Sequence, residues 1–284
     1  MVFRPALSSL EASETGVFGP VSFRDYVDEH DLTASPRTPR YISVDSLDDL
    51  APELREAGVM VLRAGSAPDG TGTAFVLVDA PDGAEAFFLR DEDLFADQPV
   101  VEIASPVERE QLLSFTLLPT LSETSLVNLG LASGVLAEAL DLDTTGALAP
   151  PATGQSTFTF EFRPHSEFDE TVTHRSGQVE VGTLFAERRD GELALFVIEA
   201  KTGARGSLAK HKLVYPLLAI AERVPADIAL VPVYLRCRRT ETGVVFEGAE
   251  CRFPDPRETV PAVDALTVER TVSTKLVLDG RASS

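Results

Sequence analysis

An acidic and a basic side chain stand two residues apart in the stretch FVIEAKTG, at the end of a long apolar run. In an extended strand, Glu199 and Lys201 point to one face and Ala200 points to the other. A carboxylate that holds Mg²⁺, beside a lysine that stabilises negative charge on a phosphate, is the chemistry of phosphodiester hydrolysis, and the Ala200 carbonyl can add a metal ligand. A structural ion pair at the end of a strand is the alternative, because charges next to a core need a partner.

A second acid lies in the preceding strand-like segment, residues 178–187. Glu180 faces one side of that segment, and a tight turn at Gly191 would join it to residues 193–200 as a hairpin. If the two segments pair in register, Glu180 and Glu199 point to the same edge. Two carboxylates from adjacent strands are the minimum set that holds a hard cation such as Mg²⁺ or Mn²⁺.

Lysine is scarce in this chain, because only four of its 25 basic residues are lysines. Three of them, Lys201, Lys210 and Lys212, lie close together around the motif. This clustering favours an anionic partner, and a solvated helix face is the alternative. The formal net charge of −20, with no Trp, is typical of a halophilic cytoplasm, where hydrated carboxylates maintain solubility and salt screens their repulsion. An ordinary acidic protein would show the same sign of charge.

Hydrophobic periodicity predicts a mixed α/β (α+β) protein with a central sheet flanked by helices. The predicted helices are residues 45–57, 105–118, 122–140 and 207–223, and the second and third of them are joined near Pro119. The predicted strands are residues 59–63, 73–78, 86–89, 156–163, 178–187, 193–200, 227–238 and 244–253. We expect an N-terminal mixed region of unknown role at 1–104 and a domain at 105–284 with the order helices, three strands, helix, two strands.

No apolar run is long enough to span a membrane, and the first residues lack the apolar segment of a signal peptide. We therefore expect a cytoplasmic protein without a membrane partner. Cys237 and Cys251 fit no metal spacing, and a reducing cytoplasm favours free, partly buried thiols.

The string GQVEVGTLFAERRDGELALFVIEAKTG, followed by SLAKHKLVYP, resembles the catalytic core of PD-(D/E)xK, or restriction-endonuclease-like, nucleases. It is most similar to prokaryotic relatives of type II restriction enzymes, over about residues 105–253. The resemblance implies that Glu199 and Lys201 are the (D/E)xK pair, that Glu180 is the acid of the preceding strand, and that Lys212 is the polar helix residue. It also implies a metal-dependent endonuclease that hydrolyses DNA in restriction, defence or repair, with Mg²⁺ or Mn²⁺ as cofactor.

Further residues follow from the same resemblance. Either Glu123 or Glu138 would be the acid of the first helix. The nearby basic residues are expected to touch the DNA backbone; they are His174, Arg175, Lys210 and His211. A homodimer would suit cleavage of both DNA strands.

One position departs from the family pattern. The metal-binding Asp of such relatives falls at Gly182, which has no side chain to offer. Either Glu180 serves as the second acid, from ~7 Å along the strand, or the metal binds weakly and catalysis is lost. In the second case the chain would be a catalytically inactive nuclease-fold protein that binds nucleic acid or acts as a scaffold.

Overall fold

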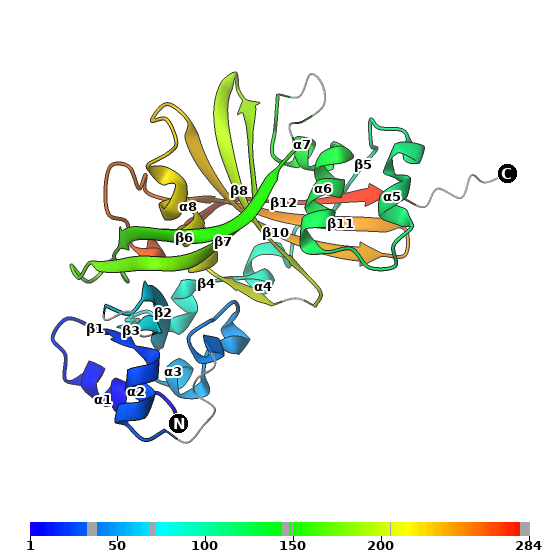
Figure 1. The fold of residues 1–284 in the computed structure, drawn as a ribbon. Coiled ribbons are helices and arrows are strands. Elements are labelled where there is room, and N and C mark those ends of the chain that lie inside the picture. Colours follow the sequence, from blue (N-terminus) through cyan, green and yellow to red (C-terminus); the bar gives the residue numbers. More distant parts are fainter. Residues whose placement is uncertain (33–38, 69–71, 144–147, 149, 205, 279–284) are drawn as a thin grey trace.

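The computed structural model describes residues 1–32, 39–68, 72–143, 148, 150–204 and 206–278. A large mixed sheet runs through the molecule, and helices flank it (Figure 1). This arrangement confirms the predicted mixed α/β architecture with a central sheet flanked by helices. Among the described helices, none has both the length and the apolar character that crossing a membrane requires.

The helices and strands before residue 105 are mostly short. They are α1 (Arg4–Glu11), β1 (Val17–Ser22), α2 (Phe23–Glu29), α3 (Pro52–Glu56), β2 (Val59–Ser66), β3 (Thr73–Asp79), β4 (Phe88–Arg90), α4 (Asp91–Phe95) and β5 (Val101–Ile103). The helices and strands after residue 105 include the longest strands of the chain. These later elements are α5 (Leu113–Thr116), α6 (Glu123–Ala132), α7 (Val135–Ala139), β6 (Ala152–Phe162), β7 (Val172–Arg189), β8 (Glu192–Thr202), β9 (Ser207–Ala209), α8 (His211–Ala221), β10 (Ala229–Thr240), β11 (Gly243–Arg252) and β12 (Thr267–Val277).

The main sheet has ten strands in the order β1-β3-β2-β7-β8-β10-β11-β12-β5, with β6 paired to β7. Strand β7 runs antiparallel to β6 and β8, β10 runs parallel to β8, and β11 runs antiparallel to β10. A parallel neighbour needs a long crossover, and α8 lies in the connection from β8 to β10. From α6 onward the predicted order of helices, three strands, helix and two strands is present, with the short β9 added before α8 and β12 added after β11.

Strand β8 is buried on both faces because helices cover both of them. Val197 packs with Leu217 of α8. Phe196 and Ile198, which point the other way, belong to a core cluster with residues of α6 and α7 such as Leu129. A strand enclosed in this way needs apolar side chains on both faces, which explains the nearly continuous apolar run before the charged pair.

The turn between β7 and β8 sets the register of the two strands. Asp190 has φ +54° and Gly191 has φ +84°, the left-handed backbone that a tight two-residue hairpin requires. The ladder then pairs Thr183 with Ile198. The predicted hairpin is confirmed, and its register brings Glu199 beside β7.

The helix predicted at 207–223 was drawn too long at its start. Residues Ser207–Ala209 form strand β9, which pairs antiparallel with β4 (Phe88–Arg90), and the helix begins only at His211. The Ser207 hydroxyl does not cap the helix but accepts a hydrogen bond from the Leu47 amide at 2.8 Å. A partner strand more than a hundred residues away therefore overrides the local helical pattern.

Other predicted helices are shorter or divided. The helix predicted at 122–140 starts where predicted, with Ser122 as its N-cap, whose Oγ accepts a hydrogen bond from the Ser125 amide at 3.2 Å. Gly134 at φ +77° then separates α6 from α7. In the region predicted as helix 105–118, the α-helix is confined to Leu113–Thr116. The helix predicted at 45–57 is reduced to a 3₁₀ turn and α3, which starts at Pro52 because proline favours the first helical turn.

The N-terminal elements are joined to the later ones by strand pairing and by a shared core. Gly65 of β2 pairs with Arg175 of β7, and a side chain at Gly65 would meet the Arg175 carbonyl oxygen at 2.3 Å. One core cluster contains Phe75 from β3 together with Val214 from α8. Residues before and after position 104 thus contribute to one sheet and one core cluster. Whether residues 1–104 and 105–284 are separate domains stays a prediction.

Candidate active site

The charged pair lies at the end of β8, as the alternation of the strand predicts. Lys201 Nζ is 3.1 Å from Glu199 Oε1, and both side chains are largely shielded, at 26% and 12% exposed. Ala200 points to the opposite face, where it joins the core cluster beneath α6 and α7. The prediction that Glu199 and Lys201 share a face is confirmed.

This pair lines a cavity of about 320 Å³. Its charged lining residues come from five parts of the chain and are Asp45, Glu123, Glu180, Glu199, Lys201 and Lys212. The predicted catalytic residues on β7, β8 and α8 therefore meet at one place. The acids Asp45 and Glu123 join them, the first from a segment in which the sequence showed no chemical motif.

Gly182 explains how Glu199 can lie against β7. A Cβ atom built at Gly182 would be 2.9 Å from Glu199 Oε2 and 3.0 Å from the Ile198 carbonyl oxygen. Contacts this short are tighter than packed side chains tolerate, so a side chain at 182 would displace the Glu199 carboxylate. The glycine at 182 and the position of Glu199 are thus linked, because the carboxylate fills the space beside the glycine.

Burial and the neighbouring opposite charges shift the pKa values of Glu199 and Lys201 in opposite directions. Burial raises the pKa of Glu199, against the effect of Lys201 and Lys212, which favour its ionised form. Burial is the largest single effect on Lys201 and lowers its pKa, but the carboxylates of Glu199, Glu123 and Asp45 together outweigh it and the net pKa lies above the ordinary value. The two outcomes differ because Glu199 is the more deeply buried partner, and they leave Lys201 protonated.

Asp45 and Lys212 form a second ion pair at the rim, with Nζ 3.1 Å from Oδ1. Burial would raise the pKa of Asp45, but Lys212 more than offsets this and the pKa lies below its usual value. The backbone carbonyl of Asp45 accepts a hydrogen bond from the Ala209 amide at 2.8 Å, just before α8 begins. Sequence reasoning missed Asp45 because only this long-range contact brings it to the cavity.

The structure separates the two candidates for the first-helix acid. Glu123 is the first residue of α6, and its Oε1 accepts a hydrogen bond from the Thr202 amide at 3.2 Å, directly after the motif. Glu138 lies on α7 with an exposed side chain and is not among the residues that line the cavity. Glu123 is therefore the residue that contributes to this site.

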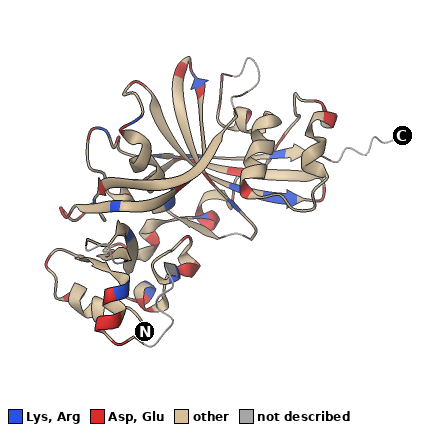
Figure 2. Cartoon of the chain, viewed as in Figure 1, with Lys and Arg blue, Asp and Glu red and all other residues tan. Residues whose placement is uncertain are grey.

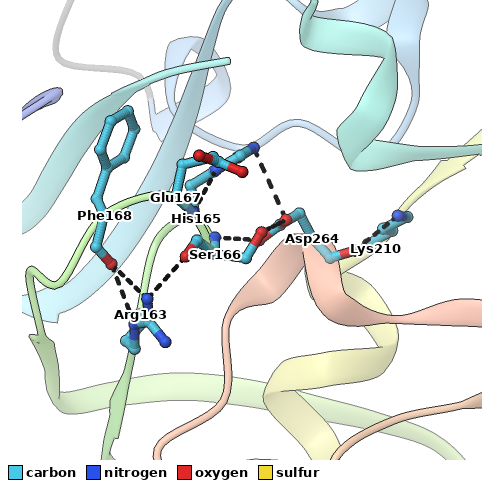
Figure 3. Close-up of polar contacts among 7 residues, drawn as sticks. All are labelled: Arg163, His165, Ser166, Glu167, Phe168, Lys210 and Asp264. Atoms are coloured by element: carbon cyan, nitrogen blue, oxygen red, sulfur yellow. Dashed lines mark hydrogen bonds and ion pairs between the residues drawn. The ribbon is translucent and has the colours of Figure 1, made fainter. Parts of the chain in front are cut away.

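Three of the four residues predicted to contact the DNA backbone are placed away from the open surface. His174 is 2% exposed and His211 is 8% exposed. Lys210 Nζ donates to the Asp264 carbonyl at 2.9 Å, within the group of polar contacts drawn in Figure 3. Arg175 has an exposed side chain. Of these four side chains, only that of Arg175 is exposed, and contact of any of them with DNA stays a prediction.

Asp264 organises the polar group around Lys210. Its Oδ1 accepts a hydrogen bond from the Ser166 amide at 2.8 Å, and its Oδ2 is 3.7 Å from His165 Nε2 (Figure 3). His165 Nδ1 accepts from the Glu167 amide at 3.1 Å. These contacts hold the connection between β6 and β7 against the segment before β12, which is a structural role.

The donor set at the cavity suits a hard divalent cation. In the described ranges no three His, Cys, Asp or Glu side chains are arranged as a metal cluster. Mg²⁺ needs only one or two carboxylates, since water and substrate phosphate complete its shell. Glu180 and Glu199 with the Ala200 carbonyl meet that requirement, whereas Zn²⁺ would need His or Cys, which the cavity lining does not contain.

Comparison with known proteins gives one match. A family model described as a domain of unknown function, DUF6997, matches residues 93–262. The matched segment contains β6 to β11, α8 and the cavity residues except Asp45. No curated protein and no solved structure matches the chain.

Proposed function

The chain belongs to the DUF6997 family, and we propose that it is a metal-dependent endonuclease of the PD-(D/E)xK kind that hydrolyses DNA in restriction, defence or repair. The observation that carries the proposal is the Glu199 and Lys201 pair, 3.1 Å apart in a polar cavity that Glu180 also lines. The order of helices and strands around this pair agrees with the resemblance seen in the sequence.

Each residue has a defined part in this proposal. Glu180, Glu199 and the Ala200 carbonyl would hold Mg²⁺ or Mn²⁺, which supplies a Lewis acid and lowers the pKa of bound water. Lys201 remains protonated, so its ammonium group can donate to a phosphate oxygen as negative charge develops there. Lys212 orients Asp45 and adds a second positive charge at the rim.

An inactive nuclease-fold protein that binds nucleic acid is the second candidate. Gly182 favours it, since the strand that carries Glu180 offers one acid fewer than the family pattern. The buried position of Glu199 favours the enzyme, because a largely shielded carboxylate beside a protonated lysine costs free energy that a purely structural strand end does not require.

Cleavage of plasmid DNA distinguishes the two. The purified protein is incubated with supercoiled plasmid in molar KCl with Mg²⁺, with Mn²⁺ or with chelator. Lys201→Met is compared with Lys275→Met, since Lys275 is also a partly shielded lysine in an ion pair, 2.7 Å from Glu102, but lies at another surface. We expect nicking that depends on the metal, persists in Lys275→Met and falls by at least about 100-fold in Lys201→Met. Folded protein that never nicks DNA, or equal nicking by both variants, would favour the inactive protein or another site.

A further inference from the structure

Strand β6 differs from the rest of this acidic chain in its charge. Residues 144–160 contain no Asp, Glu, Lys, Arg or His, although the whole chain has 45 acidic and 25 basic residues and a formal net charge of −20. Figure 2 shows the first part of β6 in tan, and Glu161, near its end, is the charged residue of the strand. A polyanion can therefore approach the first part of β6 without meeting a fixed negative charge on it.

The first part of β6 is also open to a partner. Every residue from 152 to 157 is exposed. Successive side chains of a strand point to opposite faces, so exposure at successive positions means that neither face is covered here. Among the described strands, β6 pairs only with β7, so the backbone groups along its other edge belong to no ladder. Two faces and one edge of residues 152–157 are thus available.

This exposed part of β6 borders the candidate active site. Thr153 and Gln155 line the cavity of about 320 Å³ together with Glu199 and Lys201. Gln155 is the ladder neighbour of Glu180, one of the proposed metal ligands. A polymer with one phosphate at the Glu199 and Lys201 pair would therefore have β6 beside its neighbouring units.

The side chains here suit a sugar–phosphate backbone better than a protein partner. Three hydroxyl groups and one amide come from Thr153, Ser156, Thr157 and Gln155. All of them donate hydrogen bonds, and such side chains regularly contact phosphate and sugar oxygens in protein–DNA complexes. Protein interfaces are instead enriched in aromatic residues, Met and Arg and depleted of Ser. Residues 152–157 contain none of the enriched types.

Gly154 adds room for close approach. A Cβ atom built at Gly154 meets no atom of the described residues within 4 Å, and the backbone there does not have the positive φ that favours glycine. Neither packing nor backbone conformation therefore requires a glycine at this position. A glycine inside a strand often marks a place where a ligand or another backbone comes close.

Few cations are available at this place to bind phosphates. The cavity lining has two, Lys201 and Lys212, and each forms an ion pair with a carboxylate of the chain. Arg175 is the exposed basic residue on the part of β7 that pairs with β6. DNA held here would depend mainly on uncharged hydrogen bonds, which release fewer counterions than lysine and arginine contacts do.

We propose that residues 152–157 of β6 form the surface along which the substrate DNA leaves the candidate active site, held by uncharged contacts to its sugar–phosphate backbone. The inference rests on the proposed function for its nucleic-acid partner, and it adds where and how the DNA is held. Contacts of this kind lose little affinity in concentrated salt, because they depend little on counterion release. A second copy of the chain, paired to the open edge of β6, is the competing occupant.

A matched pair of glutamine substitutions tests this surface. Gln155→Glu and Gln111→Glu each add one negative charge at an exposed position, and Gln111 lies in the 3₁₀ turn before α5, outside the cavity lining. Binding of labelled duplex DNA is measured by fluorescence anisotropy in molar KCl with Ca²⁺, a hard cation that carboxylates also bind. We expect affinity to fall by at least about 10-fold in Gln155→Glu and to stay within about 2-fold in Gln111→Glu. Equal affinity in the two variants, or no binding by the unaltered protein, would overturn the proposal.

The salt dependence of the unaltered protein gives a second test that needs no variant. With Lys201, Lys212 and Arg175 as the nearby cations, the slope of log affinity against log KCl concentration should be no steeper than about −3. A steeper slope would place the binding on a basic surface elsewhere and overturn the proposal.

Sedimentation of the protein without DNA separates the competing occupant. A mass of two chains that becomes one in Gln155→Glu would assign the surface to a second copy and overturn the DNA assignment. DNA binding that is weakened in Gln155→Glu, without plasmid nicking by the unaltered protein, would refute the nuclease proposal alone. Plasmid nicking that is equal in Gln155→Glu and Gln111→Glu would refute this inference alone.

Discussion

Acid should destabilise this protein through two buried histidines, and His174 allows the effect to be worked out. Its ring is 2% exposed and burial lowers its pKa to about 4, while an unfolded chain restores the ordinary value of 6.5. The unfolded state therefore binds the proton first as pH falls, so stability is complete above about pH 6.5 and is lost on the way down to about pH 4. Between about pH 7.5 and pH 5, one such histidine removes about 2 kcal/mol from the free energy of unfolding.

The assay compares the change in the free energy of unfolding between the two pH values, because the many carboxylates also titrate in acid. Chemical unfolding is measured at both pH values for the unaltered protein, for His174→Gln and for His30→Gln. Glutamine keeps a donor for the Phe158 carbonyl but does not titrate, and His30 is an exposed histidine of the same chain. The acid-induced loss should shrink by about 2 kcal/mol in His174→Gln and stay the same in His30→Gln. Equal acid-induced losses of unfolding free energy in all three proteins would refute the reasoning, since His174 would then titrate alike in the folded and unfolded states.

Two more substitutions test the site and its support. Gly182→Ala should displace the Glu199 carboxylate, because the added carbon would lie 2.9 Å from Glu199 Oε2. We expect the free energy of unfolding to fall by about 1–3 kcal/mol and metal-dependent nicking to be lost. Unchanged nicking would show that the Glu199 carboxylate accommodates the added carbon without losing its position. Arg236→Met leaves the fully buried Asp91 without its ion pair and should cost about 3–5 kcal/mol in denaturant unfolding, against a change within about 0.5 kcal/mol for exposed Arg252→Met. If Arg236→Met lowers the free energy of unfolding no more than Arg252→Met does, the buried ion pair does not stabilise the fold.

The parts of the fold that sequence reasoning predicts correctly depend on local patterns. Alternation along β8 places Glu199 and Lys201 on one face, and the turn at Gly191 fixes the register of the hairpin. Both signals operate over a few residues, where backbone geometry leaves little choice. The strand and hairpin that carry the motif were therefore predictable.

The parts that escape prediction depend on contacts between distant segments. Ser207–Ala209 has a helical pattern but pairs with β4, and Asp45 reaches the cavity through the Ala209 amide. The burial of His174 and His211 follows from packing on Tyr215 and not from any pattern near them. No periodicity records such pairings, because they depend on the tertiary arrangement of the whole sheet.

Several described elements were also missing from the prediction. Strand β12 extends the sheet beyond β11, and β1 adds an edge strand beside β3. Strand β12 (TVERTVSTKLV) consists mostly of polar and β-branched residues that do not alternate regularly, so its periodicity is weak. The same weakness applies to β5, which has three residues.

Binding of Mn²⁺ to the isolated protein tests the central claim most directly. The free ion is measured by electron paramagnetic resonance in molar KCl for the unaltered protein, for Glu199→Gln and for Lys275→Met. Our account predicts one bound ion per chain, with affinity lowered by more than about 10-fold in Glu199→Gln and unchanged in Lys275→Met. No bound Mn²⁺, or equal binding by the unaltered protein and Glu199→Gln, would contradict a metal site at the end of β8.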